Sequence, residues 1–214
     1  MTELAKAGFS VEDAMAAARG TLQLATAGQI DAAKAAEIQS NAMNAFKLQS
    51  KDAAHVADLL ANAAIASSAG IPDIGQALQQ VGGIAQGFGE NLDDTIAALA
   101  MFANAGVKGS DAGTLLKTTM QSITDQGNPA QGAIKELGLE LYKLNNQGQN
   151  QFVGFRELFR QLDEAKKRLN DPEMFQAQTN ILFGSDAMRS AMLGNAEAFD
   201  EMHAKIERVG AASE

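Results

Sequence analysis

The 214-residue chain has no cysteine and no tryptophan, only three prolines, and few aromatic residues. Without cysteine it cannot build a disulfide framework or a zinc–thiolate site. Its apolar runs, such as AALAMFANAG, are far shorter than the roughly 20 residues of a membrane-spanning helix. The opening MTELAKAGFS lacks the basic and apolar regions of an export signal. We therefore expect a soluble segment with no export signal at its start.

Basic residues are also in short supply. The chain carries 26 acidic and 17 basic residues, which gives a formal net charge of −9. A surface of this sign repels the phosphate backbone, so a grip on nucleic acid over the whole surface is not expected. We predict no sequence-specific nucleic-acid partner.

Alanine dominates what is present, with 41 residues, 29 of them before residue 108. Alanine has the highest helix propensity and β-branched residues are sparse, so the composition predicts an all-α fold. Four helices in this region close on Ala-Gly, in ELAKAGFS, QLATAGQID, IASSAGIPD and MFANAGVKGSD. A glycine there can take the left-handed conformation that ends a helix, and signals for a new helix follow at Ser10, Asp31, Pro72 and Ser110.

The apolar periodicity predicts helices at about 11–26, 31–46, 51–69, 73–86, 91–105 and 110–124. After residue 126 the composition changes, and Pro129 begins a short helix. The polar, glycine-containing NNQGQN lies between apolar residues and predicts a small β-hairpin near 139–153. Two further helices follow, in RELFRQLDEAKKRL and from NDPE to Phe183. The sequence thus predicts an irregular all-α domain of about ten helices.

The tetrapeptide Gly-Ser-Asp-Ala occurs twice, at 109–112 and at 184–187. Each copy is read as a glycine at a helix end, a serine N-cap and an aspartate in the first turn of the next helix. The turn residues expected to determine the fold are Gly8, Gly28, Gly70, Gly106, Gly109, Ser110, Gly113, Gly184 and Ser185.

The glycines around Lys108 raise the alternative of a phosphate-binding loop. A P-loop requires a strand, then G-x-x-x-x-G-K-[ST], then a helix. Here the preceding residues have helical periodicity, and the lysine comes before Gly109 instead of after the last glycine. The spacing also differs from the dinucleotide-binding G-x-G-x-x-G. We interpret the segment as a helix stop at Gly106 followed by a new helix.

No grouping of residues indicates catalysis. His55 and Asp58 are spaced to share one helix face, as metal ligands would, but no third or fourth ligand is evident. His203 is expected to face solvent or a partner helix. No nucleophile elbow is present, and the acidic pair Asp93-Asp94 suits the first turn of a helix. We predict no catalytic, cofactor-binding or metal-binding residues, and no enzyme activity.

The last segment, EAFDEMHAKIERVG, spaces its apolar residues by three, four and three, which is the start of a heptad seam. Methionine is enriched at adaptable binding surfaces, and two methionines occur in AMRSAMLG. The residues predicted to face a partner are Met188, Met192, Phe199, Met202, Ile206 and Val209. The predicted division is an alanine-rich core over 1–125, a hairpin-containing subdomain over 126–195, and an amphipathic helix leading out over 196–214 as a coiled-coil start.

Several motifs resemble, in order, the globular core domain of phage tail tape-measure proteins. They are ELAKAG, LATAGQIDAAKAAEIQSNAMNAF, NAGVKGSDAGTLLKTTM, ELGLELYKLNNQGQNQF and ILFGSDAMRSAMLG, and together they extend over residues 1 to 195. The resemblance implies a structural virion protein that fills the tail tube during assembly, sets tail length and leaves ahead of the genome. It brings no catalytic residues and no cofactor.

The resemblance also implies where the protein acts and with what. It implies a location in the virion tail, in the tube lumen or at the tip, and in the host bacterial cytoplasm during assembly. The implied partners are other copies of the chain, tail-tube and tail-tip proteins, and tail assembly chaperones. Two alternatives stay open: a membrane-active segment that assists DNA passage through the host inner membrane, because small residues permit close helix packing in lipid, and a cell-wall hydrolase.

Overall fold

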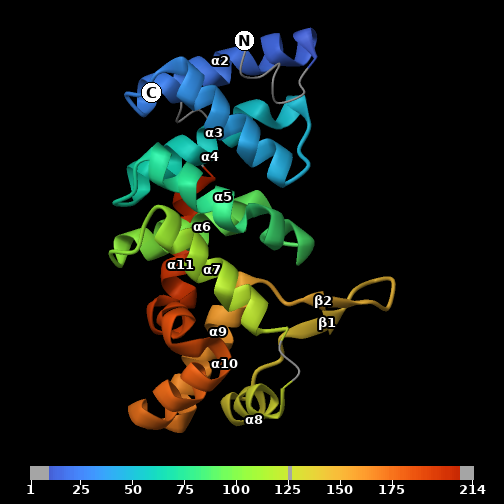
Figure 1. Ribbon diagram of the computed structural model, residues 1–214, viewed down its shortest axis with the longest axis vertical. Coiled ribbons are helices and arrows are strands. Elements are labelled where there is room, and N and C mark those ends of the chain that lie inside the picture. Colours follow the sequence, from blue (N-terminus) through green and yellow to red (C-terminus); the bar gives the residue numbers. More distant parts are fainter. Residues whose placement is uncertain (1–9, 125–126, 208–214) are drawn as a thin grey trace.

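The computed structural model describes residues 10–124 and 127–207. Over these residues the elements are, in order, α2 (Val11–Ala27), α3 (Ala32–Ala45), a short 3-10 helix η1 (Ser50–Asp52), α4 (Ala53–Ala66), α5 (Ile71–Gly87), α6 (Leu92–Asn104), α7 (Ser110–Ser122), α8 (Asn128–Leu137), β1 (Tyr142–Leu144), β2 (Asn150–Phe152), α9 (Phe155–Leu169), α10 (Pro172–Leu193) and α11 (Ala196–Ile206). The helices form an elongated stack, with α2 and α3 at one end, α8 and α10 at the other, and the hairpin projecting from one side (Figure 1). The predicted all-α fold with one small hairpin is confirmed.

Most helix boundaries lie close to those predicted. The largest difference is the segment expected at 51–69, which begins as the 3-10 helix η1 and ends as α4 at Ala66. Helix α5 begins at Ile71, earlier than expected, because Pro72 fits the first turn of a helix, where its missing N–H is not needed. The side chain of Asp31 accepts a hydrogen bond from the Lys34 N–H at 2.8 Å and so caps α3.

The first part of the stack is held by small residues that let helix backbones approach closely. Every residue of α6 from Thr95 to Ala103 is buried, and four of these nine are alanine. The closest approach is between α5 and α7. There, a Cβ atom on Gly113 would lie only 2.3 Å from the carbonyl oxygen of Ala77. Gly113 therefore lies within a helix and not in a turn, and its lack of a side chain lets α7 pack closely against α5.

The second part of the molecule is joined to this stack by a chain of phenylalanine rings. The ring of Phe159 lies with its centroid 6.2 Å from that of Phe102, 6.4 Å from that of Phe155 and 5.9 Å from that of Phe199. A further ring, Phe152 of the hairpin, lies 6.0 Å from Phe155. These rings connect α6, α9, α11 and β2, so the alanine-rich helices and the later elements share one buried core.

The helix stop at Gly106 has the geometry of a Schellman motif. Gly106 has a φ of +88°, which favours glycine. The Gly106 N–H donates to the Ala103 carbonyl and the Val107 N–H donates to the Phe102 carbonyl, both at 2.9 Å. The Lys108 ammonium donates to the Ser68 carbonyl at 3.2 Å. The lysine thus ties this turn to the loop after α4.

The two Gly-Ser-Asp-Ala copies share a backbone feature that differs from the prediction. Gly109 has φ 65° and ψ −146°, and Gly184 has φ 77° and ψ 168°, so both glycines interrupt helical geometry in nearly the same way. The N-cap of α7 is Gly109 itself, and Ser110 is the first helical residue, not the cap. Ser185 follows the break that Gly184 makes within α10.

Two other predicted helix ends are corrected. Near Gly28 the positive φ belongs to Gln29, at 50°, and Gly28 instead lies tightly against Ile71. Gly70 has φ −80° and ψ 166° and is the N-cap of α5, because α4 has already ended at Ala66. The Gly70 N–H donates to the Asp73 carboxylate at 2.9 Å. Gly8 lies outside the described residues.

Candidate interaction site

The hairpin presents one apolar face to solvent. Strands β1 and β2 are antiparallel, with Tyr142 opposite Phe152 and Leu144 opposite Asn150. Side chains two residues apart lie on the same face of a strand, so these four share a face. Phe152 is buried, whereas Leu144 remains 70 % exposed and Tyr142 39 % exposed. The hairpin therefore carries large apolar side chains away from the core.

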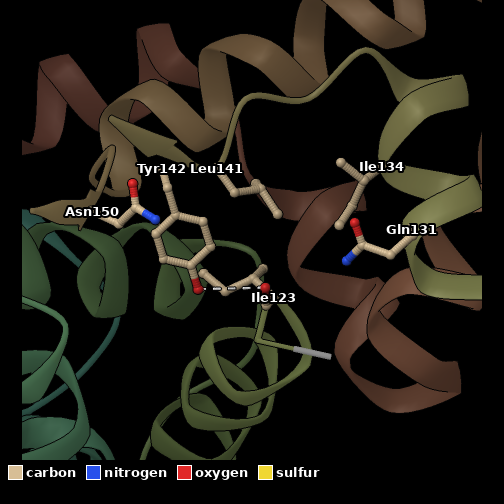
Figure 2. A pocket seen from close by; sticks show the side chains of 6 residues that line it. All are labelled: Ile123, Gln131, Ile134, Leu141, Tyr142 and Asn150. Carbon is tan, nitrogen blue, oxygen red and sulfur yellow. Dashed lines mark hydrogen bonds between the residues drawn. The ribbon is translucent and has the colours of Figure 1, made fainter. Parts of the chain in front are cut away.

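Beneath this face lies a hollow of about 390 Å³ between the hairpin, α8 and the end of α7. Its six lining residues are Ile123, Gln131, Ile134, Leu141, Tyr142 and Asn150 (Figure 2). The Tyr142 hydroxyl donates to the Ile123 carbonyl at 3.5 Å, and burial raises the pKa of this phenol. The hollow is apolar with two amides at its rim, which suits an apolar side chain of a partner.

Tyr142 also lines two neighbouring hollows, of about 460 Å³ and 420 Å³. One lies against Phe88 and Gly89 at the end of α5, and the other lies against Arg156 and Glu157 at the start of α9. Three hollows thus meet at one tyrosine. The hairpin and its surroundings are therefore hollowed on several sides of Tyr142.

A buried carboxylate, Glu90, supports the base of the hairpin. It is 8 % exposed and accepts a hydrogen bond from the Phe155 N–H, in the first turn of α9. Burial, together with the nearby charge of Asp94, raises the pKa of Glu90 from its usual 4.5 to about 7. The group lies where Gly154 leaves space, since a Cβ there would be 3.4 Å from a Glu90 carboxylate oxygen.

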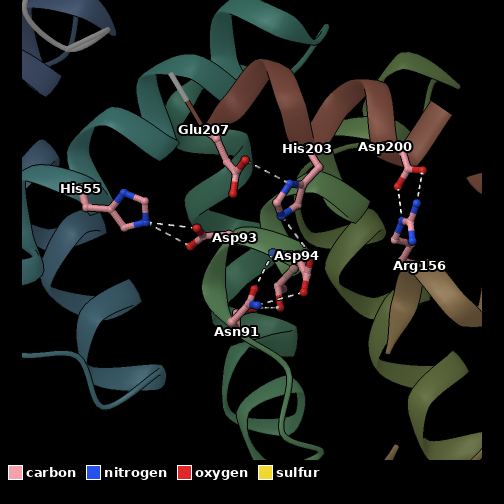
Figure 3. A network of polar contacts seen from close by, with 9 residues as sticks. His55, Asn91, Asp93, Asp94, Arg156, Asp200, His203 and Glu207 are labelled. Carbon is pink, nitrogen blue, oxygen red and sulfur yellow. Dashed lines mark hydrogen bonds and ion pairs between the residues drawn. The ribbon is translucent and has the colours of Figure 1, made fainter. Parts of the chain in front are cut away.

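Both histidines of the chain meet the first turn of α6. His55 Nε2 lies 3.1 Å from an Asp93 carboxylate oxygen, and His203 Nε2 lies 3.1 Å from an Asp94 carboxylate oxygen (Figure 3). Asn91 caps this helix, accepting from the Asp94 N–H at 2.6 Å. His55 therefore contacts Asp93 of another helix, and His203 contacts Asp94 of α6 instead of facing solvent or a partner.

Helix α11 is fastened to the stack at several points. Arg156 makes two hydrogen bonds to the Asp200 carboxylate, at 2.5 and 2.7 Å. At the other end of α11, the Asn62 side-chain amide donates to the Ile206 carbonyl at 2.8 Å. These contacts, with the His203 pair, hold the helix against α4, α6 and α9.

The heptad seam of this helix is therefore turned inward. Phe199, Met202 and Ile206 are buried at 1 %, 4 % and 0 % exposure in the common core, which corrects their assignment to a partner interface. The same apolar spacing that would serve a second chain serves α4 and α6 of this chain. Val209 and the side chains of Met188 and Met192 lie outside the described residues.

Sequence reasoning missed both Tyr142 and Glu90. Tyr142 is the only tyrosine of the chain. Its place in a predicted hairpin could have marked it, because an aromatic ring on a two-stranded sheet has a face that another part of the protein or a partner must cover. Glu90 follows the Gly-Phe-Gly segment that ends α5, and nothing in the linear pattern marks it as buried. Among the residues described, no group of three or more side chains could hold a metal ion.

Comparison with known proteins decides the family. The family model of phage-related minor tail proteins matches residues 1–184. The chain belongs to this family. The tape measure protein of Pneumococcus phage Dp-1 is 30% identical over 240 residues, covering 100% of this chain and 20% of that protein. The resemblance to tape-measure proteins is confirmed.

A second relative is more distant. The probable tape measure protein of Escherichia phage P2 is 26% identical over 188 residues, covering 88% of this chain and 23% of that protein. The chain thus spans about a fifth of the length of these curated relatives. No solved structure matches it.

Proposed function

We propose that this chain is a folded domain of a phage tail tape-measure protein, with a structural and not an enzymatic role. The observation that carries the proposal is the match over the whole chain to a tape measure protein. The fold supports it, because the described residues form a helical stack with exposed apolar side chains on the hairpin and with both histidines held against carboxylates.

The proposed role separates this domain from the part of the protein that measures length. A helix advances 1.5 Å per residue, so an extended helical region converts residue number into tube length while tube subunits polymerise around it. A stack that folds back on itself does not. We assign length setting, templating of the tube and release ahead of the genome to the whole protein, located in the tail tube or tip and in the host cytoplasm during assembly.

The hairpin surface is the proposed contact with other tail components. Exposed Leu144 and Tyr142, next to an apolar hollow, offer an anchor and a receiving pocket for a tail-tip or tail-tube protein or an assembly chaperone. Other copies of the chain are proposed as partners too.

The test is tail length in the phage that encodes this chain. Blocks of predicted helix are deleted from the gene product outside residues 1–214, and tails are measured by electron microscopy. We expect tails to shorten by about 1.5 Å for each residue removed. Tails of unchanged length, or a gene product with no sequence outside these residues, would contradict the proposal.

Membrane activity is a second candidate, favoured by the close helix contacts at small residues such as Gly113 against Ala77. Among the described helices, none has the length and apolar character needed to cross a bilayer. Leakage of dye from liposomes, compared with a scrambled chain, tests this candidate. Clearing of peptidoglycan by the purified chain would instead support a cell-wall hydrolase.

A further inference from the structure

Helix α2 lies at one end of the stack (Figure 1). Three of its large apolar side chains are exposed. Val11 is 76 % exposed, Met15 65 % and Leu22 57 %. At 3.6 residues per turn, the three lie within about 40° of one another around the helix axis. The other strongly exposed aliphatic side chains, Ile65 and Leu144, lie on different elements. The α2 stripe, defined as Val11, Met15, Ala18 and Leu22, is therefore a continuous apolar face that no helix within residues 10–124 and 127–207 covers.

The spacing of the α2 stripe is four, three and four residues, which reads the same in both directions. In heptad terms the four residues take positions d, a, d and a. When two α2 helices lie antiparallel, Val11 of one copy meets Leu22 of the other, and Met15 meets Ala18. All four layers then contain apolar residues, and the small Ala18 gives room for the long Met15 side chain.

Charges beside the stripe choose between the two orientations. Glu12 and Arg19 each follow a d residue and are exposed on the same flank of α2. In an antiparallel pair this flank meets its own copy, so Glu12 lies near Arg19 of the other chain, twice by symmetry. In a parallel pair this flank would meet the opposite flank of the other copy, where the corresponding residues are the uncharged Ala14 and Thr21. The antiparallel pair alone therefore brings opposite charges together, which is favourable.

We propose that the α2 stripe is a self-association surface, on which two copies of this chain pair through antiparallel α2 helices. The pair is isologous, so it closes as a dimer and leaves the hairpin surface of each copy free. One helix face buries less area than a stable dimer requires, so we expect weak association, strengthened where copies are concentrated. The proposal does not depend on the proposed tape-measure role.

Disulfide crosslinking tests the orientation, because the chain has no cysteine of its own. Val11→Cys and Leu22→Cys are purified separately, then mixed and oxidised mildly. We expect the mixture to crosslink rapidly. Val11→Cys alone should crosslink slowly, since the two Val11 positions lie about 16 Å apart along an antiparallel pair. The similarly exposed Ile65→Cys gives the rate of random collision. Fast crosslinking of Val11→Cys alone, or a mixture no faster than Ile65→Cys, would overturn the proposal.

A charge exchange tests the same pair without touching the apolar stripe. Sedimentation equilibrium is measured up to roughly 1 mM, the range for weak interfaces. Glu12→Arg and Arg19→Glu should each raise the dimer Kd severalfold, and the double variant should restore it. Met15→Glu should raise Kd at least about tenfold by placing a charge in the seam, while Ile65→Glu should not change it. A chain that stays monomeric at all concentrations, or a dimer whose Kd does not respond to these substitutions, would refute the interface. Circular dichroism checks that each variant is folded.

Discussion

The alanine-rich helices α2 to α7 and the elements around α9 are packed by opposite means. In the first region helices approach until backbone meets backbone, as Gly113 of α7 does against Ala77 of α5. In the second region the space between elements is filled by large rings, with Phe159 at 0 % exposure lying against rings of two other elements, α6 and α11. A methyl group contributes little on burial and a ring contributes much.

This difference predicts opposite sensitivities in the two regions. Removing atoms should damage the region held by phenylalanine rings, because each ring fills space that nothing else can fill. Adding atoms should damage the alanine-rich region, because its helices have no space left. Phe159→Ala removes atoms in the second region and Gly113→Ala adds one methyl group in the first, so the two variants test these opposite sensitivities.

The largest loss is expected from truncating the central ring. Phe159→Ala should lower the free energy of unfolding by about 3–5 kcal/mol, through lost burial and the cavity left behind. Leu144→Ala is the control, since Leu144 is 70 % exposed and should change little. Urea denaturation measures both. Equal effects of the two substitutions would mean that the ring cluster does not hold the domain together.

The next effect is expected from adding one methyl group. Gly113→Ala should cost about 1–3 kcal/mol, because the new Cβ would meet the Ala77 backbone and force α5 and α7 apart. Gly132→Ala is the matched control, a helical glycine of α8 with open space at its Cβ. There the same change should stabilise by about 0.5–1 kcal/mol through helix propensity. If both variants gain stability, the close approach of α5 and α7 is wrong.

Glu90, at the junction of the two regions, predicts a dependence on pH. Its pKa is raised to about 7 in the folded protein, so the folded state holds a proton that the unfolded state loses near pH 4.5. Stability that is present below pH 4.5 is therefore lost as pH rises through 7. Glu90→Gln should remove this loss and stabilise the protein by about 1–2 kcal/mol at pH 8, with no gain at pH 4. Thermal unfolding at both pH values measures this, and an equal effect at the two would contradict it.

A further effect, of similar size, concerns the helix stop. Gly106→Val should lower the melting temperature, with a cost of about 1–2 kcal/mol, because a β-branched residue is strained at a φ of +88°. No atom lies within 4 Å of the position of a Cβ there, so crowding does not contribute. Gly106→Asn, which tolerates this conformation better, should lose less. An unchanged melting temperature for the valine variant would contradict the assigned turn.

Local signals predicted the helices well, and they predicted some turns but not others. The Ala-Gly stop at Gly106 succeeded because its next residue, Val107, reaches back to Phe102 as the motif requires. The same pattern failed at Gly70, where α4 ends four residues earlier and the glycine starts α5 instead. A glycine suits either end of a loop, and only the packing of the two helices decides which.

Long-range placement could not be predicted from the sequence. The heptad spacing of Phe199, Met202 and Ile206 showed that α11 has an apolar face but not which helices cover it. The contact between His203 and Asp94 joins residues far apart in the chain, and so does the contact of Glu90 with Phe155. The hollow at Tyr142 likewise depends on how α8 lies under the hairpin.

The central claim is that two differently packed regions form one cooperative unit, joined through Phe102, Phe159 and Phe199. Amide hydrogen exchange of the 214-residue chain tests this claim most directly. In one cooperative unit the core amides of α6, α9 and α11 open together, so their protection should correspond to the same free energy of opening. Exchange of α11 at rates orders of magnitude faster than α6 would contradict the claim and would return α11 to the role of a helix that leaves the domain.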